Sequence, residues 1–461
     1  MRRRNRSIGW VRVGPVLLAG ILAHPAGFLA AEPKGSTTMT RAVRPLANEL
    51  VKVYESPAPK SVFTYSPGLA RCPTGRLVAT MDLGGPGVAR LPGVKAQRAA
   101  GRFCQGKIFT SDDRGRTWTH RADFGFLHAR PFVAGRSLYV LGHCNDLMVI
   151  RSSDWGRTWS KPARLTDGER WHQAPCNVHY ANGCVYLVME RRSKDSKVRG
   201  WYVKDIAPVL MRAKVDADLT QRKSWAFASA PTFGQAVDEH HLDYFGVPFY
   251  KVHPERGAVV APGRHCAPAG WLEANVVQFV DPNHYWCDPA GRTFHLWMRA
   301  HTGWTNMAAV CKVVEGPDGR MKTMLETVPS GKKALLVPCP GGQMKFHILY
   351  DKKTRLYWLL SSQATDSMTR AEKLPRNRYN LPNNERHRLQ LHFSRNCIDW
   401  CFAGLVAVGP VEKASRHYAS MVIDGDDLHV LSRSGDQRAA SAHDGNFISF
   451  HTIRDFRNLR Y

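Results

Sequence analysis

The sequence predicts an all-β fold, a six-bladed β-propeller, and three observations lead to this prediction. After residue 50 the chain consists of short β-branched or aromatic runs separated by Gly, Asp, Asn and Pro turns, with little helical periodicity. An eight-residue turn motif occurs twice, and the two copies are 41 residues apart, the length of one four-stranded blade. Further hairpin-rich units fill the rest of the chain and bring the total to six.

The amino terminus predicts a secretory signal peptide over residues 1–31. Several arginines precede an apolar stretch from Val13 to Ala31 that is rich in Leu, Ala and Gly. Pro15 and Pro25 interrupt this stretch, which makes it a poor continuous membrane helix and a reasonable cleavable segment. An uncleaved membrane anchor is the alternative. We expect residues 32–461 to form one exported propeller domain, periplasmic or extracellular, without a stable membrane span after cleavage.

The chain is strongly basic, with 65 Lys and Arg residues against 38 Asp and Glu residues and a formal net charge of +27. Such a balance first suggests nucleic acid as a partner. The basic residues are scattered along the chain, however, and an exported protein rarely meets nucleic acid. Anionic glycans fit better, and a charge that only sets solubility is the alternative. We expect a carbohydrate partner, no nucleic acid and no cofactor, and the oligomeric state is left open.

The cysteines and the acidic and histidine-rich run predict no metal centre. The eleven cysteines include no CxxC pair and, being an odd number, leave at least one thiol without an internal partner. An Asn182-Gly183 turn would place Ala181 opposite Cys184, so Cys176 and Cys184 should not bridge. We expect most of the cysteines to be buried thiols. The run from Asp238 to Asp243 fits no metal-site spacing.

The repeated turn motif has a mechanical interpretation. The copies are Ser111-Asp-Asp-Arg-Gly-Arg-Thr-Trp118 and Ser152-Ser-Asp-Trp-Gly-Arg-Thr-Trp159, and Ser394-Arg-Asn-Cys-Ile-Asp-Trp400 is a degraded third copy. In each full copy the Asp can accept hydrogen bonds from the turn backbone, the Gly supplies a positive φ, and the Trp packs between blades. These residues are Asp113 and Asp154, Gly115 and Gly156, and Trp118 and Trp159.

The six predicted units are joined by two long irregular insertions, residues 236–269 and 364–390, which we expect to help build a binding site. The strand from Leu50 to Glu55 is expected to close the ring against the last blade and so remove the open sheet edge. The units cover residues 61–124, 126–167, 171–235, 270–328, 340–411 and 415–454.

The repeated motif resembles the Asp-box of the sialidase (BNR-repeat) superfamily, whose members are six-bladed propellers. Blade four strengthens the resemblance, because Glu273 is followed by a Val-Val run and a turn, and hairpin register places it opposite about Arg299. The resemblance implies that Glu273 activates a tyrosine nucleophile and that Arg299 binds a substrate carboxylate. A structural salt bridge is the alternative.

Blade six carries the expected nucleophile. The segment Tyr418-Ala-Ser-Met421 is similar to the family's segment around the catalytic tyrosine, and hairpin register places Tyr418 opposite about Arg433, with Arg416 two residues back on the same face. A phenol needs a base and nearby cations to ionise near neutral pH, and Glu273 and the arginines could supply them. The alternative is a tyrosine of the core.

Blade one departs from the family pattern. Tyr65 stands where the first arginine of the family's carboxylate-binding triad belongs, and tyrosine cannot replace a bidentate guanidinium. No Asp or Glu occurs between Leu83 and Ser111. Asp82 is therefore our candidate for the general acid, with ligand binding as its other role. The chain is expected to be a divergent member of the superfamily.

Further polar residues are expected at the same end of the channel and would make the pocket polar and cationic. Trp171, Trp271 and Trp304 are expected to offer flat faces to sugar rings. The remaining candidate substrate-binding residues are Arg130, His128, His172, Gln343 and Asp366.

These observations predict an exported exo-acting glycoside hydrolase for acidic glycans, either sialic, uronic or sulfated. The sialidase mechanism uses a tyrosine in place of the second carboxylate of most glycosidases. A non-catalytic glycan-binding propeller is the second hypothesis, because a fold is often kept when its chemistry is lost. A polysaccharide lyase is the third.

Overall fold

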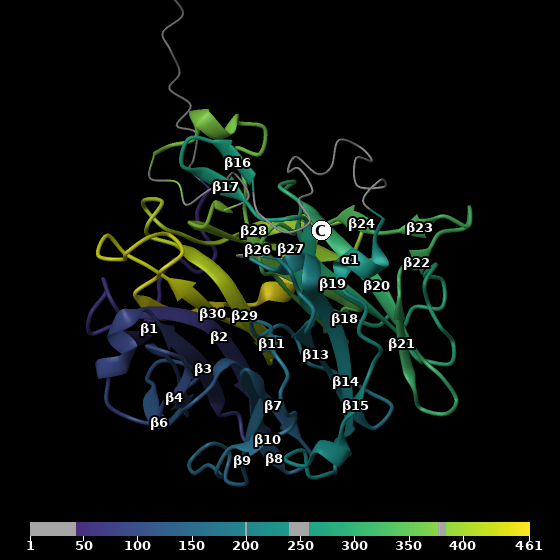
Figure 1. Ribbon diagram of the computed structural model, residues 1–461, viewed down its shortest axis with the longest axis horizontal. Helices are drawn as coiled ribbons and strands as arrows, with labels where there is room; N and C mark the ends of the chain where they lie inside the picture. Colours follow the sequence, from purple (N-terminus) through teal and green to yellow (C-terminus); the bar gives the residue numbers. More distant parts are fainter. Residues whose placement is uncertain (1–42, 199–200, 239–257, 377, 379–383) are drawn as a thin grey trace, which may run out of the picture. The chain divides into compact units, whose positions relative to one another are not determined.

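Antiparallel sheets of four or five strands form the blades of the six-bladed propeller that the sequence predicts (Figure 1). The computed structural model describes residues 43–198, 201–238, 258–376, 378 and 384–461, and residues 44–461 make one compact unit. The predicted signal peptide, residues 1–31, lies outside the described residues. The predicted units correspond to the observed sheets, except that the sheet of blade four also includes strand β24 (Leu336–Pro338), beyond the predicted end at residue 328.

In blades one to three the strands lie in chain order from the channel outward. In blade three two short strands, β11 and β12, both pair with β13 at the innermost edge. In blade one two strands, β4 and β6, both pair with β5 at the outer edge. The strands are β2 (Phe63–Arg71), β3 (Leu77–Gly84), β4 (Ala96–Ala99), β5 (Arg102–Ser111) and β6 (Thr119–Phe124) in blade one; β7 (Leu127–Ala134), β8 (Ser137–Cys144), β9 (Asp146–Ser152) and β10 (Ala163–Arg164) in blade two; and β11 (Trp171–His172), β12 (His179–Ala181), β13 (Cys184–Arg192), β14 (Ile206–Lys214) and β15 (Ala226–Phe227) in blade three.

Blades four to six follow the same plan. Short pairs β16–β17 and β22–β23 and helix α1 (Phe233–Ala236) lie outside the blade sheets. The strands are β18 (Gly270–Val277), β19 (Thr293–His301), β20 (Met307–Glu315), β21 (Met321–Met324) and β24 (Leu336–Pro338) in blade four; β25 (His347–Asp351), β26 (Leu356–Ser362), β27 (Arg388–Ser394) and β28 (Cys401–Val408) in blade five; β29 (Arg416–Asp424), β30 (Asp427–Ser434), β31 (Phe447–Ile453) and β1 (Val51–Glu55) in blade six; and, outside the blades, β16 (Ala258–Ala261), β17 (Arg264–Cys266), β22 (Glu326–Thr327) and β23 (Lys333–Ala334).

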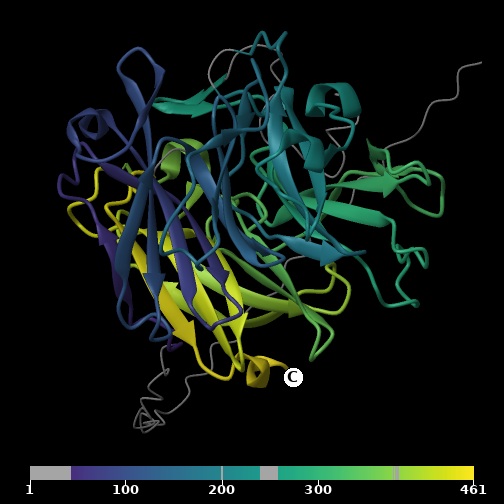
Figure 2. The same ribbon diagram turned by 90° about the horizontal axis from the view of Figure 1, so that it is seen from below.

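The amino-terminal strand closes the ring. Strand β1 pairs antiparallel with β31, so the first and last parts of the propeller share one sheet. Figure 1 and Figure 2 both show the purple strand beside the yellow strands of blade six. This pairing confirms the predicted closure, and it satisfies a sheet edge that would otherwise present unpaired backbone groups.

The hydrophobic core is divided among the blade interfaces, because each middle strand is buried on both faces. Along β3, Leu77, Ala79 and Met81 pack toward blade six, whereas Val78 packs toward blade two. Successive side chains of one strand therefore pack in two different blade interfaces. One buried cluster lies at each of the six contacts between neighbouring blades of the described chain.

The repeated turns have the hydrogen bonds that the sequence predicts. Asp113 accepts a hydrogen bond from the Thr117 N–H at 2.9 Å, and Asp154 accepts one from the Thr158 N–H at 2.9 Å. In the degraded copy Asn396 takes the place of the aspartate and accepts a hydrogen bond from the Asp399 N–H at 2.9 Å. The turn thus survives where its sequence has diverged.

Replacing Gly115 with alanine should destabilise the propeller more than the same change at Gly168. Both glycines have positive φ, +87° and +65°, which costs an alanine about 1 kcal/mol. At Gly115 the added Cβ would also lie 2.0 Å from the Phe450 ring, whereas at Gly168 no atom lies within 4 Å. We expect Gly115→Ala to lose about 2 kcal/mol more than Gly168→Ala in urea unfolding. Equal losses would show that the blade contact contributes nothing.

Candidate functional site

A cavity of about 1040 Å³ opens at one end of the central channel, and residues from all six blades line it. It combines carboxyl groups, guanidinium groups, imidazoles and aromatic rings within one space. The charged and aromatic lining residues include Tyr65, Asp82, Arg98, Arg102, His128, His172, Trp201, Tyr202, His265, Glu273, Arg299, His301, Arg386, Tyr418, Arg433 and His443.

A β-bulge in the innermost strand directs several of these side chains into the cavity. In β18 the pairing with β19 is interrupted between Leu272 and Asn275, and in β29 the pairing with β30 is interrupted between His417 and Ser420. The same interruption occurs in β2 and β7. At each bulge the first extra residue has positive φ: Ser66 47°, His128 55°, Glu273 61° and Tyr418 52°.

Because of the bulges, the observed hairpin register differs by one residue from the register expected from the sequence. Arg299 pairs with Leu272 rather than with Glu273, and Arg433 pairs with His417 rather than with Tyr418. A one-residue shift would normally send a side chain to the opposite face of the sheet. The left-handed bulge residue reverses this effect, so Glu273 and Arg299 still line the same cavity.

Tyr418, Glu273 and Arg299 form a connected cluster. Arg299 Nη1 donates a hydrogen bond to the Tyr418 hydroxyl oxygen at 2.9 Å and lies 3.5 Å from Glu273 Oε2. Arg299 therefore connects the Tyr418 hydroxyl with the Glu273 carboxylate. Burial and the Glu273 charge raise the pKa of Tyr418 to about 12, although Arg299 and Arg386 oppose the rise. The phenol is therefore protonated at neutral pH and has a carboxylate at hand to accept its proton.

Two further guanidinium groups face the Tyr418 ring. The Arg433 guanidinium carbon lies 5.3 Å from the ring centroid and that of Arg386 lies 5.8 Å from it. Arg386 is held by contacts with His417 Nδ1 at 3.0 Å and Asn384 Oδ1 at 2.9 Å. Together with Arg299, these groups surround the phenol with three buried positive charges.

Tyr65 positions one of these arginines. The Arg433 guanidinium carbon lies 4.0 Å from the Tyr65 ring centroid, a cation–π contact, and the Tyr65 hydroxyl donates to Asp444 Oδ1 at 2.5 Å. Burial raises the pKa of Tyr65 well above its usual range. The residue that replaces the expected arginine of blade one is thus a neutral ring against which a blade-six arginine stacks.

Asp82 is a buried carboxyl group at the end of β3. Its side chain accepts a hydrogen bond from the His128 N–H at 3.1 Å. Burial raises the pKa of Asp82 to about 7, and the His128 N–H and the Arg433 charge oppose that rise only in part. A carboxyl group with this pKa is protonated at mildly acidic pH and can donate a proton to a leaving group.

A second carboxyl group, Glu190, supports the floor of the cavity. His172 Nδ1 lies 2.7 Å from Glu190 Oε2, and the Glu273 backbone N–H donates to Glu190 Oε1. His128 Nδ1 lies 2.9 Å from His143 Nε2, and the rings of His128 and His172 meet edge to face with centroids 4.7 Å apart. His172 therefore anchors the Glu273 bulge through Glu190.

Four residues predicted to bind substrate do not line this cavity, so their expected placement is corrected. Arg416 donates to the backbone carbonyls of Ser415 and Gly435. Gln343 accepts a hydrogen bond from Arg299 Nε at 2.7 Å with its backbone carbonyl. The Gln343 side chain does not line the cavity; its Oε1 accepts a hydrogen bond from the Asn306 N–H at 2.9 Å.

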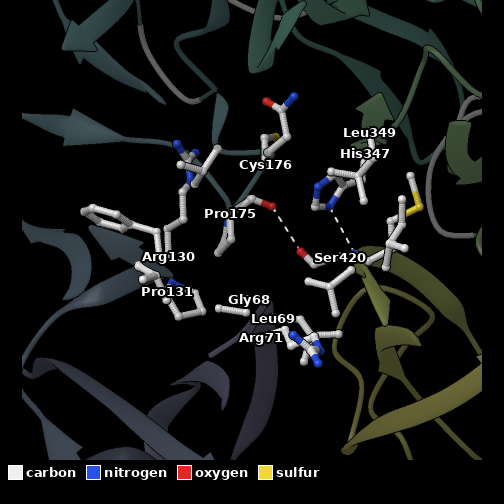
Figure 3. A pocket seen from close by; sticks show the side chains of 18 of the residues that line it. Gly68, Leu69, Arg71, Arg130, Pro131, Pro175, Cys176, His347, Leu349 and Ser420 are labelled. Atoms are coloured by element: carbon white, nitrogen blue, oxygen red, sulfur yellow. Dashed lines mark hydrogen bonds between the residues drawn. The ribbon is translucent and has the colours of Figure 1, made fainter. Parts of the chain in front are cut away.

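Asp366 and Arg130 complete the correction. Asp366 pairs with the buried Arg378, with Nη2 and Oδ2 2.8 Å apart, in the blade-five insertion. Arg130 lies two residues after the bulge residue His128, where pairing with β8 resumes, and it lines a separate part of the channel (Figure 3). Residues after the bulge belong to a different level of the channel.

The aromatic residues of the cavity also differ from those expected. Trp171 and Trp271 are buried in the interfaces between blades, where Trp271 donates to the Ile206 carbonyl at 2.9 Å, and Trp304 does not line the cavity. Trp201 and Tyr202 line it instead. Their segment, between blade-three strands, carries no repeat that would reveal it in the sequence.

Sequence reasoning missed several lining residues on insertions. Arg386 and Asn384 lie in the insertion 364–390, and His265 lies in the insertion 236–269, so both segments were identified correctly although their residues were not. Arg98 lies in the short strand β4, and Arg102 is the first residue of β5. The insertion residues carry no register, so hairpin arithmetic could not place them.

The described residues contain no group of three or more His, Cys, Asp and Glu side chains arranged to hold a metal ion. Most of the run Asp238–Asp243 lies outside the described part of the chain. No helix within that part is both long and apolar enough to cross a membrane. All eleven cysteines are free thiols in the structure, and Cys184 pairs with Ala181 across the hairpin as expected.

No family model matches the sequence, and no curated protein matches it. Solved structures do match. The Hadza microbial sialidase Hz136 aligns over 88% of this chain and 68% of its own, with a TM-score of 0.50 and 15% identity. This chain has a sialidase-type propeller fold. A Dyadobacter fermentans protein of unknown function covers 88% of this chain and 98% of its own (TM-score 0.49, 11% identity). Trypanosoma rangeli sialidase covers 89% of this chain, which matches 60% of the sialidase (TM-score 0.47, 13% identity).

Replacing Asp82 with asparagine should remove a pH dependence of stability. The folded-state pKa of about 7 lies above the unfolded value, so the group stabilises the fold at low pH and that contribution is lost as the pH rises toward 7. Between pH 5 and pH 8 the wild type should lose about 3 kcal/mol relative to Asp82→Asn in urea unfolding. Asp444→Asn is the matched control: because the pKa of Asp444 is lowered, its contribution to stability changes only below about pH 4, and this variant should keep the wild-type profile between pH 5 and pH 8. Parallel pH profiles for wild type and Asp82→Asn would contradict the raised pKa.

Proposed function

We propose that this chain is an exported exo-acting glycoside hydrolase of the sialidase type that acts on acidic glycans. One observation carries the proposal. A buried tyrosine, Tyr418, accepts a hydrogen bond from Arg299, which also pairs with the carboxylate of Glu273, in a cationic cavity. A pocket lined from six blades suits a glycan end better than the middle of a chain, because a polymer would need an open groove.

In the first proposed step Tyr418 is the nucleophile. Glu273 takes the phenol proton while the phenolate oxygen forms a bond to the anomeric carbon. The bond from the anomeric carbon to the leaving-group oxygen breaks, and its electron pair goes to that oxygen. Asp82, protonated below its pKa of about 7, donates its proton to the same oxygen. The product of this step is a glycosyl–tyrosine.

In the second proposed step water replaces the tyrosine. Asp82, now a carboxylate, removes a proton from the water as the water oxygen bonds to the anomeric carbon. The bond to Tyr418 breaks, and Glu273 returns the proton to the phenolate. The positive charge of Arg299 stabilises the phenolate in both steps, because it already donates a hydrogen bond to that oxygen. Two displacements at one carbon retain its configuration.

The cationic lining supports an anionic substrate. Arg299, Arg386 and Arg433 lie around Tyr418, and guanidinium groups bind carboxylate and sulfate through paired hydrogen bonds. Because Tyr65 lies where the family has an arginine, we do not restrict the proposed substrate to sialic acid. The proposed substrate class is defined by its anionic group and includes sialic, uronic and sulfated sugars. The name of the matching Hadza microbial protein, a sialidase, supports the same class.

The second candidate function is glycan binding without turnover. It is favoured by the missing blade-one arginine, and the same experiments decide between the two, because a binding protein retains affinity for acidic glycans but releases no sugar. Export to the periplasm or the extracellular space is part of the proposal and rests on the arginine-rich and apolar amino terminus.

Replacing Tyr418 with phenylalanine should abolish turnover while preserving binding. We expect kcat on a panel of 4-methylumbelliferyl sialosides, uronides and sulfated glycosides to fall about 10³-fold or more, since the nucleophilic oxygen is gone. Tyr357→Phe is the matched control: that buried tyrosine donates to the Gln278 carbonyl at 2.8 Å, far from the cavity, and its loss should leave kcat unchanged. Equal turnover by Tyr418→Phe and wild type would remove tyrosine from the mechanism.

Replacing Asp82 with asparagine should make the rate depend on the leaving group. Without a proton donor, kcat/KM for a glycoside with a sugar leaving group should fall about 10²- to 10⁴-fold, because the departing alkoxide needs the proton. For a 4-nitrophenyl glycoside, whose leaving group departs unprotonated, the loss should be less than about 10-fold. Equal losses on both substrates would assign Asp82 to binding or structure rather than to proton transfer.

Replacing Arg386 with methionine should weaken recognition of the anionic group. We expect kcat/KM to fall about 10- to 100-fold on an acidic glycoside and to change little on its neutral methyl ester. Arg416→Met is the control, since the guanidinium of Arg416 binds backbone carbonyls away from the cavity. A similar loss for both variants, or for both substrates, would contradict the assignment of Arg386 to the substrate anion.

A further inference from the structure

Two thiols from neighbouring blades meet beside the main cavity. Cys104 lies near the start of β5 in blade one, and Cys144 is the last residue of β8 in blade two. Their sulfur atoms are 3.4 Å apart. Cys104 is completely buried, whereas Cys144 is partly exposed. The pair is therefore open to solvent reagents from the Cys144 side.

Two glycines and two phenylalanines hold β5 and β8 close together next to the thiols. Gly106 and Gly142 each lie two residues from one of the cysteines and so on the same face of its strand. A side chain at Gly106 would collide with the Phe124 ring, and one at Gly142 would collide with the Phe126 ring. These two rings pack with their centroids 4.3 Å apart. The approach of the two strands is thus fixed by packing, and the thiols lie at its end.

The position of the two cysteines suits a disulfide bond. Such a bond is about 2.05 Å long, so the sulfur atoms must approach by about 1.4 Å. Cys104 lies beyond the last pairing of β5 with β3, which is at Gln105, and Cys144 directly precedes the turn at Asn145. Rotation of the two side chains and a small movement of these strand ends can close the gap without disturbing the blade interface.

The surroundings favour Cys144 as the reacting thiol. Its contact with Cys104 and the positive charges of Arg98 and Arg164 lower the pKa of Cys144 below its usual range. The same contact and burial raise the pKa of Cys104. The thiolate is the form that attacks a disulfide. The partly exposed sulfur is therefore also the better nucleophile.

We propose that Cys104 and Cys144 are a site of oxidation and form a disulfide bond between blades one and two. The oxidant is a low-molecular-weight disulfide of the glutathione type. The Cys144 thiolate bonds to one sulfur of the oxidant, the S–S bond of the oxidant breaks, and its other sulfur leaves and takes up a proton. Cys104 then loses its proton and bonds to Cys144 Sγ, and the second half of the oxidant leaves as a thiol. Two protein thiols are oxidised, and one disulfide is reduced to two thiols.

The bond would restrain one wall of the main cavity. It joins the β4–β5 hairpin, whose Arg98 and Arg102 line that cavity, to the end of β8. Asn145 Nδ2 already donates to the Arg98 carbonyl at 3.5 Å between the same two segments. A covalent link is much stronger than this long hydrogen bond. It also closes a loop between residues 40 apart in the chain, which lowers the entropy of the unfolded state.

Peptide mapping of the full chain tests the proposal directly. The reduced protein is equilibrated under native conditions with oxidised glutathione, alkylated, and digested with trypsin without reductant. Cys104 falls in the tryptic peptide 103–107 and Cys144 in the peptide 137–151, each of which contains a single cysteine. We expect these two peptides to be joined and two hydrogen atoms lighter than their sum. Alkylation of both thiols, glutathione adducts alone, or a bond from Cys144 to another cysteine overturns the proposal.

Thermal unfolding with matched variants provides the second test. The oxidised wild type should have a Tm about 3–5 °C above that of the reduced protein, because the closed loop destabilises the unfolded state. Cys144→Ala should lose this difference. Cys401→Ala, which removes another partly exposed thiol, should keep it. A difference that survives in Cys144→Ala contradicts the assignment to this pair; should that variant not fold, the wild-type peptide map decides. Neither experiment uses a substrate, so both are independent of the proposed hydrolase activity.

Discussion

The candidate site depends on a backbone constraint at the innermost strands. Each blade is packed between two neighbours, so the alternating side chains of a regular strand are committed to one blade interface or the other. Glu273 and Tyr418 escape this alternation because they occupy the first position of a bulge with positive φ. A non-glycine residue in this conformation costs about 1–3 kcal/mol, and such strain is characteristic of functional sites.

The interfaces between blades hold this strain in place. Clusters of buried aliphatic and aromatic side chains lie on both sides of the strands that carry the bulges. Hydrogen bonds add local support: the Glu273 N–H donates to Glu190, whose other oxygen meets His172. The acidic and basic groups of the site are consequently rigid before any ligand arrives, which is the condition for electrostatic stabilisation of a charged transition state.

The channel separates two uses of buried positive charge. Around Tyr418 the arginines face carboxylates and an open cavity, so they can meet both a substrate anion and a developing phenolate. At the next level Arg130 and Lys345 donate to backbone carbonyls and form no ion pair with a carboxylate of the described residues, and proline, aliphatic and aromatic residues make up most of the wall of a smaller cavity there.

The sequence alone determined the fold, because blade repeats, turn motifs and strand alternation are local properties. The ring closure by β1 could be anticipated because an unpaired sheet edge needs a partner. The residues of the bulged strand ends could be anticipated because hairpin register joins residues that are close in the chain. Register was wrong by one residue at Glu273 and Tyr418, because a bulge leaves no clear mark in the sequence. Only the tertiary structure decided that Arg386 faces Tyr418, that Arg416 and Asp366 do not, and that Trp201 and Tyr202 supply the aromatic wall. These positions depend on how insertions fold across blades, and no local periodicity encodes that path.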